Sequence, residues 1–131
     1  MKAIAWAFAG TILLATSWAG AAGATSPDYD KCVDKTEGVT SAMRDCATIE
    51  GDRQDRELNA LYKQAMGLRD AAAREQLRLQ ERAWLKMRSA QCHKVLMEND
   101  GTGALLDSDG CWLDLTDKRI AELRALANGR P

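Results

Sequence analysis

The chain has 131 residues, with 18 Lys and Arg against 19 Asp and Glu, one His, four Cys and two Pro. This length fits a single small domain. A net charge of −1 excludes the basic surface by which proteins grip nucleic acid, so we expect no nucleic-acid partner.

The first 24 residues have the layout of a secretory signal peptide. Met1-Lys2 is a short positive start, residues 3–15 are uncharged and mostly apolar, and Ala22-Gly23-Ala24 offers a cleavage site of small residues. The apolar run is shorter than the roughly 20 residues of a membrane span, and no Cys stands at the cleavage site to carry a lipid. We therefore expect a periplasmic or secreted protein without a membrane anchor, whose mature domain is residues 25–131.

The mature chain begins with a short helical segment and a long helix. Residues 28–36 can form a helix that turns at Gly38. From Thr40 to Gly67 there is no Pro and helix-forming residues dominate, which favours one helix. Thr40 is the expected N-cap and Gly67 the expected stop. Gly51 costs about 1 kcal/mol relative to Ala in a helix, so we expect a bend or a loosening there.

A second long helix follows, capped by Asp70 and running to about residue 97. Two helices joined by a turn near residue 69 lie antiparallel. Residues at one level then have numbers that add to about 138. Glu50 is thus predicted to face Arg88, and Asn59 to face Gln80.

These four polar residues fall on or beside the apolar stripes of the two helices. We interpret them as a buried ion pair and a buried amide pair that fix the register of the hairpin. A polar functional site is the other interpretation of the same residues.

The last part of the chain is predicted to be a loop followed by a third helix. Residues 98–110 are rich in Gly and Asp, which is typical of a loop. Asp109 can cap a helix over residues 110–127. Arg119 lies in the middle of the apolar face of that helix and is expected to join Glu50 and Arg88 in one network.

The four cysteines are predicted to form two disulfide bonds, because an exported chain meets an oxidising compartment. All four gather at one end of the predicted bundle, so three connectivities are possible. The symmetric placement about the two turns favours Cys32–Cys46 with Cys92–Cys111. The pairing of Cys46 with Cys92 and of Cys32 with Cys111 comes second.

The residues give no sign of a metal, a cofactor or an active site. The cysteines are 14, 46 and 19 residues apart, too far for the close pairs of a zinc site. The run Asp107 to Gly110 resembles part of a calcium loop, but the later ligand positions hold Cys111 and Lys118. No hydrolase, metalloprotease or nucleotide motif is present. We therefore expect no enzyme.

The order of these residues resembles the LprI-like lysozyme-inhibitor family. The resemblance covers about residues 29–126 and rests on four runs in order: C32-VDKTE-G38-V-T40 to E50, L58-N59-AL-Y62, Q80-ER-A83-W84-LKM-R88-SAQ-C92, and T116-DK-R119. It implies an all-α fold: a small disulfide-stapled helical bundle, made of a long antiparallel hairpin with a short N-terminal and a C-terminal helix. It also implies a protein that binds a lysozyme and so protects peptidoglycan.

Two binding modes are open for such a protein. The segment 98–110 carries acidic residues and glycines that could dock on a cationic lysozyme: Asp100, Gly101, Thr102, Gly103, Asp107 and Asp109. The second long helix carries cations that could enter a cleft containing two catalytic carboxylates: Arg74, Arg78, Arg82 and Lys86. The alternative function is an envelope interaction module with another protein partner. The oligomeric state is left open.

Overall fold

The computed structural model describes residues 25–129 and contains four helices within that range. They are α1 (Pro27–Asp34), α2 (Thr40–Gly67), α3 (Ala71–Glu98) and α4 (Gly101–Ala127). The all-α helical bundle predicted from the sequence is confirmed. The predicted signal peptide lies outside the described residues.

The helix ends follow from local chemistry. Pro27 occupies the first turn of α1, and the Ser26 hydroxyl accepts a hydrogen bond from the Tyr29 amide at 3.2 Å. The Asp70 carboxylate caps α3 by accepting from the Ala73 amide at 2.9 Å, as predicted. Thr40 is not an N-cap, because the helix already includes it and Val39 precedes it in an extended conformation.

The connections are short. Glu37 and Gly38 both have positive φ, 51° and 80°, which reverses the chain between α1 and α2. At the end of α2, Arg69 donates to the Ala65 carbonyl at 2.6 Å and Arg74 donates to the Met66 carbonyl at 3.1 Å. These cations satisfy carbonyls that the helix itself leaves unpaired.

The helix α4 begins about two and a half turns earlier than predicted. Residues 101–110 are helical, and only Asn99 and Asp100 connect α3 to α4. Asp109 is therefore inside the helix and does not cap it. Burial of Ala104, and a hydrogen bond from the Ser108 hydroxyl to the Cys92 carbonyl, hold this segment against α3. These tertiary contacts offset the roughly 1 kcal/mol that each Gly costs in a helix.

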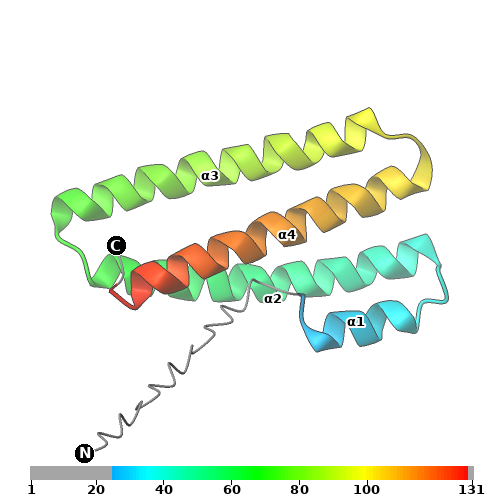
Figure 1. The fold of residues 1–131 in the computed structure, drawn as a ribbon, viewed down its shortest axis with the longest axis horizontal. Helices are drawn as coiled ribbons and strands as arrows, with labels where there is room; N and C mark the ends of the chain where they lie inside the picture. Colours follow the sequence, from blue (N-terminus) through cyan, green and yellow to red (C-terminus); the bar gives the residue numbers. More distant parts are fainter. Residues whose placement is uncertain (1–24, 130–131) are drawn as a thin grey trace, which may run out of the picture.

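The helix α4 packs against both α2 and α3, and Figure 1 shows it between them along most of its length. Because α3 runs antiparallel to both neighbours, α2 and α4 are parallel (Figure 1). Because α4 lies between α2 and α3, the prediction that facing residues of these two helices have numbers adding to about 138 fails for most of their length. Tyr62 and Leu77 still meet in one cluster near the turn, but the residues further along do not pair as predicted.

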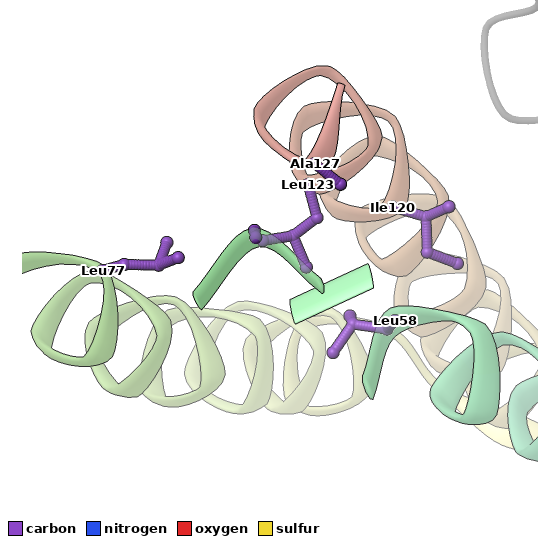
Figure 2. Close-up of a cluster of buried hydrophobic side chains, with 6 residues drawn as sticks. Leu58, Leu77, Ile120, Leu123 and Ala127 are labelled. Carbon is purple, nitrogen blue, oxygen red and sulfur yellow. The ribbon is translucent and has the colours of Figure 1, made fainter. Parts of the chain in front are cut away.

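The apolar core lies at the end of the bundle that holds the α2–α3 turn. Figure 2 shows Leu58, Leu77, Ile120 and Leu123 converging from three helices. Ala65 and Ala127 complete the buried cluster, and Trp84 packs against it. Near the opposite end the structure pairs Cys32 with Cys46 and Cys92 with Cys111, the connectivity that the sequence favours. One end is thus held by hydrophobic burial and the other by covalent bonds.

No helix within residues 25–129 combines the length and the apolar character needed to cross a bilayer.

Candidate functional site

An ion pair between Arg119 of α4 and Glu81 of α3 lies at the centre of the bundle. Arg119 Nε and Nη2 donate to Glu81 Oε2 at 2.9 and 2.6 Å, and both side chains are only 9% exposed. Arg119 Nη1 also donates to Glu122 at 2.8 Å. Burial tends to lower the pKa of Arg119, but its hydrogen bonds to Glu122 and Glu81 outweigh this and raise it. The guanidinium is fixed and charged.

Arg88 is the second buried cation, and two tryptophans enclose it. Its guanidinium carbon lies 3.8 Å from the ring centre of Trp112 and 4.6 Å from that of Trp84. Nη1 donates to the Thr116 hydroxyl at 2.8 Å and to Asp55 at 3.3 Å. Burial lowers the pKa of Arg88, and Asp55 opposes that effect. Stacking between two rings partly replaces the hydration that the cation has lost.

Glu50 of α2 anchors the segment that precedes α1. Its carboxylate is 3% exposed and accepts from the Ser26 amide at 2.8 Å and the Ser26 hydroxyl at 2.7 Å. Arg53 donates to it twice, at 3.0 and 2.7 Å. Burial alone would raise the pKa of Glu50, but the hydrogen bonds from Arg53 and Ser26 lower it to about 2.

Stability should therefore fall in acid as Glu50 is protonated. An unfolded Glu titrates near 4.3, so the contribution of a carboxylate with a depressed pKa is complete above that value and is lost as the pH falls towards 2. We expect Glu50→Gln to cost about 2 kcal/mol at pH 7 and almost nothing at pH 2. Urea unfolding across this range measures the difference.

Asp52→Asn is the control for this experiment, because Asp52 is exposed and makes no ion pair within residues 25–129. An equal loss of stability from Glu50→Gln at pH 2 and pH 7 would contradict the role given to the carboxylate.

Gln54 and Asp117 form a fourth buried polar contact, between α2 and α4. Gln54 is fully buried, and its Nε2 donates to Asp117 at 2.7 Å and to the Leu113 carbonyl at 3.2 Å. Burial raises the pKa of Asp117, and the hydrogen bond from Gln54 works in the opposite direction.

The structure does not join the residues of the predicted polar network. Glu50, Arg88 and Arg119 are buried, but each has its own partners and Glu50 does not face Arg88. Asn59 and Gln80 are exposed, so the predicted amide pair is wrong. The insertion of α4 separates α2 from α3. The inward-facing residue of α3 is Glu81 and not Gln80.

Sequence reasoning missed Gln54 and Glu81 as buried residues. Each lies four residues from a buried leucine of the same helix, Leu58 and Leu77 respectively. Helical neighbours share a face at this spacing, so the signal was present in the apolar stripe.

An acidic groove of about 240 Å³ lies on the surface between α2 and α4. Its carboxylates belong to Asp52, Asp55 and Asp109. Trp112 and Gly51 also line the groove. The side chain of Asp55 is 47% exposed and that of Asp109 is 25% exposed. Arg44 holds Asp109 through a hydrogen bond of 2.8 Å at the rim.

Gly51 of α2 lines this groove. The helix continues through Gly51 without interruption, so the expected loosening is not observed. A Cβ at this position would meet Leu113 Cδ2 at 3.8 Å, an ordinary contact. The absence of a side chain at Gly51 therefore relieves no clash.

Of the six residues predicted to form a partner-binding loop, only Asp109 lines this groove. Gly101, Thr102, Gly103 and Asp107 are exposed on the first turns of α4, and Asp100 precedes the helix. The correction follows from the earlier start of α4, which makes this region rigid and helical.

Within the described part of the chain, no group of three His, Cys, Asp or Glu side chains is arranged to hold a metal ion. The buried ionisable groups of this region are tied into ion pairs, hydrogen bonds and aromatic stacking. The groove between α2 and α4 instead presents partly exposed carboxylates, two of which contact arginines of the chain.

Comparison with known families gives one match. A sequence model of the family described as lysozyme inhibitor LprI matches residues 32–123. The matched range includes all four cysteines and the buried Glu50, Glu81, Arg88 and Arg119. No curated protein and no solved structure shows a significant match to the chain.

Proposed function

The chain belongs to the LprI lysozyme inhibitor family, and from this premise we propose that it is an exported protein that binds a lysozyme and so protects peptidoglycan. Export is supported by the signal-like first 24 residues and by two disulfide bonds, which are typical of oxidising compartments. Catalysis has no support in the buried polar residues, since their contacts are structural.

The acidic groove between α2 and α4 is the observation that carries the proposal for the binding surface. Three carboxylates line a concave surface beside Trp112. Asp52 makes no ion pair within residues 25–129, whereas Asp55 contacts Arg88 and Asp109 contacts Arg44, each leaving part of the carboxylate exposed. C-type lysozymes are cationic, so a Lys or Arg of the enzyme can enter the groove and gain from a field focused by several carboxylates. Trp112 supplies the rigid aromatic surface that is common at binding hot spots.

The alternative mode, in which cations of α3 enter the lysozyme cleft, is the second candidate for the binding surface. Arg74 donates to the Met66 carbonyl and Arg78 is paired with Glu75. Two of the four cations predicted for this role are thus engaged within the chain.

Neutralising the groove should weaken lysozyme binding. We expect the triple variant Asp52→Asn, Asp55→Asn, Asp109→Asn to raise the Kd at least roughly tenfold at low salt, because the attraction for the partner's cation is lost. The wild-type affinity should fall steeply between low and high salt, while that of the variant changes little. Titration calorimetry with a C-type lysozyme measures both effects.

The matched control removes three charges elsewhere: Asp34→Asn, Glu98→Gln and Asp107→Asn. These residues are exposed and do not line the groove. If both triple variants weakened lysozyme binding equally, net charge alone would explain the effect. That result would contradict the proposal that the groove is the binding site. Absence of any wild-type binding would instead favour an envelope interaction module with another partner.

A further inference from the structure

A second groove, of about 260 Å³, runs between α2 and α3. The two helices are held apart by α4, which makes the main contacts with each of them. Leu58 and Tyr62 of α2 and Leu85 of α3 form the apolar part of this groove. Tyr62 is half-buried and Leu85 is 42% exposed, so apolar and aromatic surface is accessible to a ligand.

An unpaired acceptor belongs to a residue that lines this groove. Glu81 contributes to the lining, and Arg119 occupies only its Oε2. The other oxygen, Oε1, is buried and accepts no hydrogen bond from residues 25–129. A buried carboxylate oxygen without a donor costs free energy. Because Oε1 is buried, a ligand N–H or O–H reaches it only when side chains of the groove shift, and it then gains more than at an exposed site.

The rim of the groove is cationic. Arg78 and Arg82 both line it. Arg78 is paired with Glu75, whereas Arg82 is exposed and makes no ion pair within residues 25–129. Asn59 adds an exposed amide with no hydrogen bond to the rest of the described chain. The groove thus offers guanidinium and amide donors at its edge, an acceptor at Glu81 and an aromatic ring.

We propose that the α2–α3 groove binds a carboxylate-bearing fragment of the cell-wall glycan, an N-acetylated amino sugar with its attached peptide. Such a ligand carries carboxylates for Arg82, amide and hydroxyl donors for Glu81, and a sugar ring that can lie on Tyr62. Of the function proposed above, this inference uses only export to the compartment of the cell wall.

The rim of this groove carries positive charge, whereas the acidic groove carries negative charge. One molecule could therefore bind cell-wall glycan at one surface and a cationic enzyme at the other. An acidic protein segment would satisfy Arg82 equally well. The accessible part of the Tyr62 ring favours the glycopeptide, because a sugar ring can lie on an aromatic ring while the attached carboxylates contact Arg82.

The experiment is a titration of the purified oxidised protein with a soluble disaccharide-peptide released from peptidoglycan, followed by amide chemical shifts in NMR. We expect saturable shifts confined to residues around Asn59, Tyr62 and Arg82. A neutral chitin oligosaccharide, which has the same N-acetylated sugars but no carboxylate, should bind at least roughly tenfold more weakly.

The variant Arg82→Glu should raise the Kd of the disaccharide-peptide at least roughly tenfold. Lys86→Glu is the matched control: Lys86 is exposed one turn further along α3, does not line the groove and changes the charge equally. Asn59→Ala, an exposed substitution that keeps the helix, should also weaken binding.

Three outcomes would overturn the proposal: no saturable shifts at millimolar ligand, equal loss in the Arg82 and Lys86 variants, or stronger binding of an acidic peptide than of the disaccharide-peptide. Inhibition of lysozyme is measured separately, on the wild-type protein. Glycan binding without inhibition would therefore reject the lysozyme proposal and keep this one, and the reverse result would do the opposite.

Discussion

Replacement of Arg119 by Met is expected to lower the free energy of unfolding by about 3–5 kcal/mol, because it leaves a buried charge without its partner. Glu81 would lose both hydrogen bonds to Oε2, and its Oε1 already has no donor in the part of the chain that the structure describes. The carboxylate would then have to be protonated or hydrated inside the bundle, and either process costs free energy. Chemical unfolding monitored by circular dichroism measures the loss.

The double variant Glu81→Met, Arg119→Met tests the cause of that loss. Replacing both partners by apolar residues of similar size removes the uncompensated charge, so the double variant should recover most of the stability. Glu122→Gln is the control, since Glu122 is 62% exposed and contacts the same arginine; exposed pairs contribute about 0–1 kcal/mol. A double variant as unstable as Arg119→Met would show that packing, and not charge, sets the loss.

The second large effect is expected from the disulfide bond between α3 and α4. The double variant Cys92→Ala, Cys111→Ala removes a bond between residues that are 19 positions apart. A disulfide bond that closes a loop of this size contributes about 3 kcal/mol to the free energy of unfolding. For a domain of about 100 residues this corresponds to a fall in Tm of roughly 10–20 °C. Thermal unfolding of the oxidised proteins measures it.

The other disulfide bond provides the contrast. Cys32–Cys46 spans 14 residues, but it ties down α1, which has no buried residue. Without the bond, α1 can detach while the three long helices remain folded, so the loss is limited to the free energy with which α1 is docked. We expect Cys32→Ala with Cys46→Ala to lower the Tm less than the other pair does. Hydrogen exchange should show α1 opened and α4 still protected. The reverse order of Tm values would contradict this account.

The limits of α2 and α3 were predictable because their signals are local. No Pro interrupts Thr40 to Gly67, and Asp70 provides the side-chain cap at the start of α3. The start of α4 was not predictable in this way. Three glycines and several aspartates within residues 98–110 indicate a loop, and only the burial of Ala104 and the contacts with α3 make the segment helical.

The polar contacts show a similar limit. That Arg88 and Arg119 are buried follows from their places on apolar stripes, but their partners depend on where a third helix inserts. A helical residue turns by about 100° from its neighbour, which separates the exposed Gln80 from the buried Glu81. The acidic groove joins residues of α2 with Asp109, so it could not be found before the α2–α4 packing was known.

The most direct test of the central claim is hydrolysis of peptidoglycan by a C-type lysozyme, with increasing amounts of the oxidised protein and of its Asp52, Asp55, Asp109 triple variant. The account predicts inhibition by the wild type that saturates near a one-to-one ratio, is lost on reduction of the disulfides, and is much weaker for the triple variant. No inhibition at a large molar excess, with the helical circular dichroism intact, would contradict it.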